Sequence, residues 1–231
     1  MSEIALRFRD RWSLERSAVI LAGGFSKRFG SDKGLTTLLG KPLIKYVLDA
    51  VDDVVEEAII VGSSNEQAEA YSKALGSNVK VIVDRYEVRS PLVGALTGFN
   101  EAKGEYVLLL PCDTPLVSRD VLALLLELCI NRNAAIPRWP NGYIEPLQAA
   151  YRTKPALDAA EKALTEGKLD LRSMIKRLRG IRYISTLVLQ QFDPELKMFL
   201  NINTPLDLKR AEQILKSGAK PREKRLSWKL S

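Results

Sequence analysis

The chain has 231 residues, of which 46% are hydrophobic and 27% are charged, with a net charge of +7. This length and apolar content exclude a largely disordered chain, because enough surface can be buried to offset the entropy lost on ordering. The absence of histidine excludes Ser–His–Asp catalysis and imidazole-ligated zinc, and two cysteines are too few for a four-cysteine zinc site. An enzyme of this composition must use carboxylates, lysine, arginine, hydroxyls and backbone groups, which suits phosphate chemistry with a hard cation.

The first 130 residues alternate between strand and helix patterns. Short apolar runs rich in β-branched residues predict buried strands at 18–22, 58–61, 79–83 and 106–110. Apolar residues at helical spacing predict helices at 42–50, 65–75, 91–102 and 116–130, and a polar loop with several glycines is expected at 23–41. This alternation predicts a parallel sheet with right-handed crossovers and helices on both faces.

The second half of the chain is less regular. Short strands are predicted at 134–136, 147–151 and 181–184, and helices at 155–166, 171–178 and 204–216. Asn203 or Thr204 is expected to cap the last helix, and Pro205 suits its first turn. Because no repeat or linker separates the two halves, we expect one domain with an appended lobe on the substrate side.

The positive charge is concentrated at the C-terminus. Residues 216–231 carry six lysines and arginines against one glutamate, whereas the rest of the chain is close to neutral. A nucleic-acid-binding domain usually spreads its basic residues over a folded face, so the pattern predicts a solvated basic tail and no nucleic-acid partner. No apolar stretch approaches the roughly 20 residues of a membrane span, and no apolar region follows the N-terminal arginines as in a signal peptide. We therefore expect a cytoplasmic protein with no membrane partner.

The most informative segment is the glycine-containing loop after the first predicted strand. Gly23 and Gly24 directly follow the strand, and Lys27, Arg28 and Lys33 come next in the same loop. The segment matches neither the Walker A pattern nor GxGxxG. Glycines let backbone N–H groups approach phosphate oxygens, and the cations can neutralise the charge on those oxygens. The loop is therefore a candidate phosphate-binding segment, and the alternative is a surface loop with solvated cations.

Acidic residues follow two further predicted strands. Asp84 comes directly after the third strand, and Asp113 comes shortly after the fourth. Because ligands of parallel α/β sheets bind beyond the carboxyl ends of the strands, these carboxylates and the glycine loop are expected to meet at one edge. Mg²⁺ bound to nucleotide phosphates takes one or two protein carboxylates, a duty that suits Asp113. The alternative for Asp113 is an Asx-type turn before Pro115.

Five ordered segments together resemble the molybdenum cofactor guanylyltransferases, the MobA-like branch of the nucleotidyltransferase superfamily. The loop LAGGFSKRFGSDKGL is similar to the family signature LAGGxSxRxGxDK, and Asp84 followed by PLVG is similar to its D…PLxG segment. PCDTP at 111–115 matches the metal-binding strand end, EPLQAAY at 145–151 resembles a second-half segment, and NINTP at 201–205 resembles the NxNTP signature. The resemblance runs from about residue 17 to residue 215, nearly the whole chain.

The resemblance implies a three-layer, Rossmann-like α/β nucleotidyltransferase fold with a mostly parallel central sheet and helices on both faces. It implies a Mg²⁺-dependent transfer of GMP from GTP to the terminal phosphate of the molybdopterin cofactor, with release of pyrophosphate. Residues 1–16 would form an N-terminal extension, 17–216 a single nucleotidyltransferase domain, and 217–231 the basic C-terminal tail. Within the domain, 17–130 would bind the nucleotide and 131–216 the acceptor.

The resemblance also assigns roles to individual residues. Catalysis is assigned to Arg28, Lys33 and Asp113, and Asp113 also binds the metal. Contacts with GTP are assigned to Leu21, Ala22, Gly23, Gly24, Lys33, Asp84 and Asp113. Acceptor-side positions are Arg172, Asn201 and Asn203. The alternative for Arg172 is a solvated cation on a helix, and the alternative for the two asparagines is capping of a helix N-terminus. These roles agree with the chemistry, because an incoming phosphate is already a nucleophile and positioning with charge neutralisation supplies most of the acceleration.

Two features depart from the family pattern and bear on the nucleobase. Gly62 stands where many relatives carry an asparagine that helps to hold the guanine or ribose, and the D…PLxG segment is longer than in the shortest members. The alternatives are a molybdopterin cytidylyltransferase, a nucleotidyltransferase for cobinamide phosphate or sugar phosphates, and an inactive nucleotide-binding regulator. LAGG in place of LAAG favours GTP and the pterin, and intact Arg28, Lys33 and Asp113 favour an active enzyme.

The expected partners are the two substrates, GTP and the molybdopterin cofactor. The resemblance leaves room for transient contacts with other proteins of cofactor biosynthesis, and a monomer is slightly favoured over an oligomer. An RNA-binding role for the basic tail gains little support from a body near neutrality.

Overall fold

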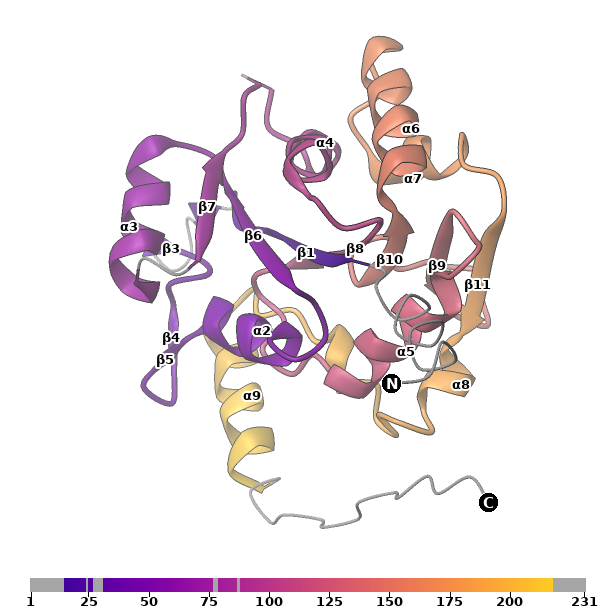
Figure 1. The fold of residues 1–231 in the computed structure, drawn as a ribbon. Coiled ribbons are helices and arrows are strands. Elements are labelled where there is room, and N and C mark those ends of the chain that lie inside the picture. Colours follow the sequence, from indigo (N-terminus) through magenta and orange to yellow (C-terminus); the bar gives the residue numbers. More distant parts are fainter. Residues whose placement is uncertain (1–14, 24, 27–30, 77–78, 87, 218–231) are drawn as a thin grey trace, which may run out of the picture.

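The computed structural model describes residues 15–23, 25–26, 31–76, 79–86 and 88–217, and its centre is one seven-stranded sheet (Figure 1). The strands are β1 (Arg16–Leu21), β6 (Glu57–Gly62), β7 (Lys80–Val83), β8 (Tyr106–Pro111), β9 (Ala134–Arg138), β10 (Ala149–Arg152) and β11 (Ile181–Ser185). Their order across the sheet is β11-β9-β10-β8-β1-β6-β7. Each neighbouring pair is parallel except those that include β10, which runs antiparallel to β8 and β9. The prediction of a mostly parallel central sheet is confirmed.

The two central strands, β1 and β8, are buried on both faces, which explains their continuous apolar sequences. In the pairing register, Leu21 at the end of β1 lies beside Val61 of β6 and beside Pro111 of β8. The carboxyl ends of these three strands therefore finish at the same level. The residues that follow these strands in the sequence therefore begin at the same edge of the sheet.

Helices cover both faces of the sheet and give the molecule three layers (Figure 1). One face carries α4 (Pro91–Glu101), α6 (Thr153–Thr165) and α7 (Leu171–Ile175), and the other carries α2 (Leu43–Val51) and α5 (Arg119–Cys129). Alternate residues of β1 serve the two cores, since Val19 packs with the α4 side while Ala18 and Ile20 pack with the α2 side. The helix α3 (Asn65–Leu75) adds Tyr71 to the core on the α2 side. The helix α9 (Pro205–Ser217) packs Ala211 against Leu38 and Leu43.

Helix boundaries follow capping residues that the periodicity alone does not reveal. The helix α3 has the predicted bounds, because the Ser64 side chain accepts the N–H of Gln67 at 3.2 Å and Gly76 follows the last turn. The helix α5 begins at Arg119 and not at residue 116, since Ser118 caps it by accepting the N–H of Val121. The helix α7 ends at Ile175, three residues before the predicted end.

The region 23–41 is more ordered than the loop that we predicted. Its described residues include two short antiparallel pairs, β2 (Phe25–Ser26) with β3 (Ser31–Asp32) and β4 (Thr37–Leu38) with β5 (Lys41–Pro42). A short helix α8 (Thr186–Leu189) and a 3₁₀ turn (Lys197–Phe199) were also not predicted. Elements of two to four residues are too short to show a period in the sequence.

Some predictions concern residues outside the described part of the chain. These are the N-terminal extension apart from its last two residues, the basic tail from residue 218 onward, and the loop residues Gly24, Lys27 and Arg28. Among the helices that the structure describes, none is long and apolar enough to cross a membrane.

Candidate active site

A cavity of about 390 Å³ opens at the carboxyl edge of the sheet. Its walls take residues from the ends of four parallel strands and from the loop after β1: Leu21, Lys33, Gly62, Asp84 and Asp113. The prediction that the loop and the two acidic residues meet at one edge is therefore confirmed. The register of the central strands is the cause, since it aligns the ends of β1, β6 and β8.

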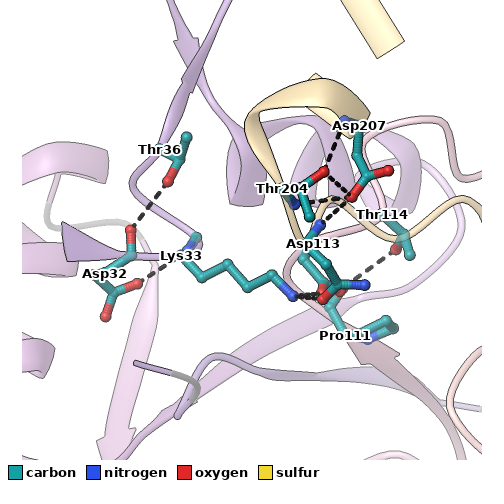
Figure 2. A network of polar contacts seen from close by, with 10 residues as sticks. Asp32, Lys33, Thr36, Pro111, Asp113, Thr114, Thr204 and Asp207 are labelled. Carbon is teal, nitrogen blue, oxygen red and sulfur yellow. Dashed lines mark hydrogen bonds and ion pairs between the residues drawn. The ribbon is translucent and has the colours of Figure 1, made fainter. Parts of the chain in front are cut away.

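The most direct contact in the cavity is an ion pair between Lys33 and Asp113. Figure 2 shows the Lys33 side chain extended across the site, with Nζ paired to the Asp113 carboxylate. The same Nζ donates a hydrogen bond to Asn203 Oδ1 at 2.6 Å. Because the lysine and aspartate side chains are only 15% and 12% exposed, water screens the pair weakly. Three distant segments thus converge on one charged cluster.

The two carboxylate oxygens of Asp113 differ in their contacts. Oδ2 accepts from Lys33, whereas Oδ1 is buried and has no hydrogen-bond partner among the residues that the structure describes. The backbone carbonyl of Asp113 accepts the N–H of Ile202 at 2.9 Å, which ties the strand end to the segment before α9. The side-chain hydrogen bonds of Asp113 go to Lys33 and not to the backbone before Pro115, so the geometry does not favour the Asx-turn alternative.

Asp113 Oδ1, which has no partner within the described ranges, fits the needs of a hard cation. Hard dications prefer oxygen ligands, and an ion bound to nucleotide phosphates needs one or two carboxylates from the protein. In the described ranges no group of three or more His, Cys, Asp or Glu side chains forms a cage for a metal. The donor set therefore suits an ion that takes its remaining ligands from phosphate and water.

Asp84 is held at the cavity wall by two donors. Its Oδ1 accepts from Thr97 Oγ1 of α4 at 2.8 Å and from the N–H of Tyr86 at 3.3 Å. Its own N–H donates to the carbonyl of Gly62 at 2.9 Å, which continues the pairing of β7 with β6. These bonds fix the carboxylate group and leave Oδ2 on the side of Gly94, where a Cβ would lie 4.0 Å from it.

The three residues at the end of β1 and just after it, Leu21 to Gly23, have different surroundings. Leu21 and Gly23 line the cavity, whereas Ala22 is fully buried and donates its N–H to Val61 at 2.9 Å. The carbonyl of Ala22 accepts the Gln67 amide at 2.8 Å, so both backbone groups of this buried residue are already hydrogen-bonded.

The sequence analysis missed three residues close to this site. The carboxylate of Asp32 accepts from the Gln67 amide and from the Tyr71 hydroxyl, both of which come from α3. Gln67 and Tyr71 are four residues apart and so share a helix face, which was the available signal, but polar side chains on a short helix are usually solvated. Only the fold brings them against the residue next to Lys33.

The acceptor-side candidates separate in the structure. A second cavity, of about 350 Å³, shares Pro91, Pro111 and Leu147 with the first and is lined by Arg172 and Asn201. The Asn203 side chain lies at Lys33 instead, so Asn203 belongs to the charged cluster. The cap of α9 is Thr204, whose Oγ1 accepts the N–H of Asp207 at 3.2 Å.

Gln148 is a further residue that the sequence did not single out. It lines the second cavity, is 2% exposed and has a φ of 82°, a left-handed conformation that costs a non-glycine residue about 1–3 kcal/mol. Its Nε2 donates to the carbonyl of Met198 at 2.8 Å, but its Oε1 is buried without a partner among the described residues. A strained backbone and a buried acceptor without a partner are typical of residues that line a binding site.

A third cavity, of about 590 Å³, shares Tyr143 and Arg172 with the second. The Arg172 guanidinium lies over the Tyr143 ring at 5.0 Å, and that of Arg138 lies over the Tyr183 ring at 5.5 Å. Lys176 adds a third cation to its lining. This combination of cationic and aromatic groups suits a ligand with planar and anionic parts.

Comparisons with known proteins agree with this architecture. Residues 18–181 match the family described as the MobA-like NTP transferase domain. The chain is 33% identical over 198 residues to a Methanosarcina mazei protein named probable molybdenum cofactor guanylyltransferase, covering 84% of this chain and 88% of that one. It is also 33% identical over 204 residues to the molybdenum cofactor guanylyltransferase of Desulfosudis oleivorans, covering 87% and 96% of the two chains.

Solved structures give the same result. The structure is similar to the molybdopterin-guanine dinucleotide biosynthesis protein A of Archaeoglobus fulgidus, with a TM-score of 0.74, 30% identity, and coverage of 87% of this chain and 99% of the other. It also shares its fold with 2-C-methyl-D-erythritol 4-phosphate cytidylyltransferase of Thermus thermophilus, at a TM-score of 0.66 and 19% identity, covering 87% and 99%. The predicted nucleotidyltransferase fold is thereby confirmed.

Proposed function

The chain belongs to the MobA-like NTP transferase domain family, and we propose that it transfers GMP from GTP to the terminal phosphate of the molybdopterin cofactor. In this reaction an oxygen of the cofactor phosphate bonds to the α-phosphorus of GTP, the bond from that phosphorus to the bridging oxygen breaks, and pyrophosphate leaves. The observation that carries the proposal is the Lys33–Asp113 cluster in the cavity at the carboxyl edge of the sheet. The guanylyltransferase names of relatives matched over more than four-fifths of the chain support the same reaction.

The proposed chemistry needs few groups from the protein. The attacking phosphate oxygen already carries negative charge, so no general base is required, and positioning supplies much of the acceleration. Lys33 would neutralise the charge that develops on the departing pyrophosphate, because its Nζ lies at the point where the loop and the end of β8 meet. Arg28 is proposed to act beside Lys33 on the same phosphates.

Asp113 is the residue that we propose to hold Mg²⁺, since its buried Oδ1 is unpartnered within the described part of the chain. When bound, the ion would supply positive charge that offsets the repulsion between the two phosphate-bearing substrates. One protein carboxylate is sufficient for a nucleotide-bound Mg²⁺. The contact of Asp113 with Lys33 keeps the carboxylate oriented toward the phosphates.

The nucleotide is proposed to lie against Leu21, Ala22, Gly23 and Gly24, with Asp84 as a further contact. Leu21 and Gly23 form part of the cavity wall, and Asp84 is fixed there by Thr97. Guanine carries N–H donors on its Watson–Crick edge, which a fixed carboxylate can accept. Apart from Leu147, the lining of this cavity comes from residues 17–130, which are proposed as the nucleotide-binding half.

The cofactor is proposed to occupy the cavities lined by residues from 131–216. A phosphate-bearing pterin has a planar ring and an anionic end, which match the stacked arginines and tyrosines of the third cavity. Arg172 and Asn201 would contact the cofactor in the second cavity, while Asn203 at Lys33 would mark where the two substrates meet. GTP and the cofactor are thus the proposed partners.

A nucleotide competition tests the proposed function. Pyrophosphate release is measured with GTP, CTP or ATP, each with the molybdopterin acceptor and Mg²⁺, and each without the acceptor. The proposal predicts acceptor-dependent release with GTP and a much lower rate with CTP and ATP. Preferred use of CTP would identify a cytidylyltransferase, and no release with any nucleotide would identify a binding protein without activity.

A further inference from the structure

The residue before Lys33 is held by a polar network that reaches across the fold. Asp32, at the end of β3, accepts through Oδ1 from the Tyr71 hydroxyl and from the N–H of Gly34 at 3.0 Å. Its Oδ2 accepts from the Nε2 of Gln67. The carboxylate therefore has three donors, two of them side chains of α3, although it touches no group proposed to react.

Gln67 uses all four hydrogen-bonding positions of its amide. Nε2 donates to Asp32 and to the carbonyl of Ala22 at 2.8 Å, while Oε1 accepts from the N–H of Ser63 at 2.6 Å and from the Ser63 hydroxyl at 3.0 Å. Gly23, which follows Ala22, and Ser63 both line the nucleotide cavity. One side chain thus ties together the end of β1, the end of β6 and the loop that carries Lys33.

Tyr71 is fully buried and is the second α3 side chain that reaches the loop. Burial raises the pKa of its hydroxyl, with smaller contributions from the nearby Cys112 and Asp32, so the hydroxyl keeps its proton and acts as the donor. A Cβ at Gly34 would overlap the Tyr71 hydroxyl. The turn that contains Lys33 therefore passes so close to Tyr71 that only glycine fits there.

We propose that Gln67 and Tyr71 are positioning residues. Through Asp32 they hold the backbone of Lys33 at a distance that lets its Nζ pair with Asp113. A lysine has a long, flexible side chain, so the place of its ammonium group depends on how firmly its backbone is held. The catalytic meaning of this network rests on the proposed function. A misplacement of about 1 Å in a group that stabilises the transition state can cost about 10²-fold in rate.

Two substitutions each remove part of the network with little change in side-chain volume. Tyr71→Phe deletes one hydroxyl, and Gln67→Met deletes the amide donors and acceptor. For both variants we expect kcat for pyrophosphate release to fall by about tenfold or more, with the KM for GTP changed by about threefold or less, because charge neutralisation is needed most in the transition state. The matched control is Tyr106→Phe: this residue is also buried, and its hydroxyl accepts the N–H of Asn131 at 3.0 Å at the other end of β8.

A double-variant cycle separates positioning from general stability. In a Lys33→Ala background, Tyr71→Phe and Gln67→Met should lower the rate by no more than about twofold, because the group that they position is gone. Full, multiplicative losses in that background would overturn the proposal. So would a Tyr71→Phe protein whose melting temperature falls as far as that of Tyr106→Phe but whose kcat equals that of the parent. If one variant does not fold, the other completes the cycle.

A binding measurement keeps this inference separate from the proposed function. The affinity for inorganic pyrophosphate with Mg²⁺, measured by calorimetry, should fall on Tyr71→Phe in the parent but not in the Lys33→Ala background. Loss in both backgrounds, or in neither, would overturn the positioning role even if guanylyl transfer is found. Absence of transfer in the parent together with this coupling would overturn the proposed function alone.

Discussion

Lys33 and Asp113 are 80 positions apart in the sequence, yet the Lys33 ammonium pairs with the Asp113 carboxylate in a site where each side chain is less than one-sixth exposed. The pair exists because β1 and β8 are adjacent and end in register, so the loop after one strand faces the residue after the other. Asn203, from the turn before α9, completes the cluster with its 2.6 Å contact to Lys33. The site is therefore a product of topology more than of local sequence.

Lys33→Ala should lower the turnover of pyrophosphate release by about 10²–10³-fold, the usual cost of removing a group that stabilises developing charge. The substitution also leaves Asp113 without its partner, so a lower melting temperature is expected as well, and the rate must be normalised to folded protein. Lys41→Ala is the matched control, since Lys41 also pairs with an aspartate, Asp49, but at the surface. Equal activity of the two variants would contradict the proposed role of Lys33.

Gly34→Ala should destabilise the fold, because the added methyl group overlaps the buried Tyr71 hydroxyl. Overpacking of this kind typically costs about 1–3 kcal/mol in the free energy of unfolding. In the Tyr71→Phe background, which lacks the overlapping oxygen, the loss caused by Gly34→Ala should be smaller than in the parent. Denaturant titration of the two single variants and the double variant measures this, and simple additivity would show that the contact is not the cause.

Asp207 should make the stability of the region around Asn203 depend on pH. The hydrogen bond from the Thr204 hydroxyl, helped by the N–H groups of Asn203 and Thr204, lowers the pKa of Asp207 below its usual value. A depressed pKa in the folded state stabilises the protein above the unfolded pKa, and this contribution is lost as the pH falls through the folded value.

The replacement Asp207→Asn should therefore lower the melting temperature at neutral pH. The difference from the parent protein should shrink at a pH below the folded pKa, where the aspartate is protonated too. Thermal melts of both proteins between pH 2 and pH 7 measure the effect. A difference that does not vary with pH would show that the charge on Asp207 is not responsible.

The order of the elements could be predicted from the sequence because most of them carry a strong local signal. The apolar runs of β1 and β8 are buried on both faces, and α3 is bounded by Ser64 and Gly76, so their existence and type follow from a short window of residues. The strand-like pairs within 23–41 could not be predicted, since each strand is two residues long.

The sequence could place a site residue where it follows a strand end closely, as Asp84 and Asp113 do, or where it lies in the glycine-containing loop, as Lys33 does. Asp84 and Asp113 were placed at the correct edge for that reason. The contact between Asn203 and Lys33, 170 positions apart, and the attachment of Asp32 to Gln67 depend on how α9 and α3 pack, which no local pattern contains. Gln148 lies inside the strand predicted at 147–151, and it is distinguished only by its backbone φ and by an amide oxygen that has no partner among the described residues.

The most direct test of the account is the Mg²⁺ dependence of pyrophosphate release, with GTP and the molybdopterin acceptor, by the Asp113→Asn variant. The amide keeps the shape of the side chain and one oxygen but removes the negative charge that holds a dication. We expect the variant to fold and to lose activity by about 10²-fold or more at any Mg²⁺ concentration. Near-normal turnover with an unchanged requirement for Mg²⁺ would contradict the assignment of Asp113 and the mechanism built on it.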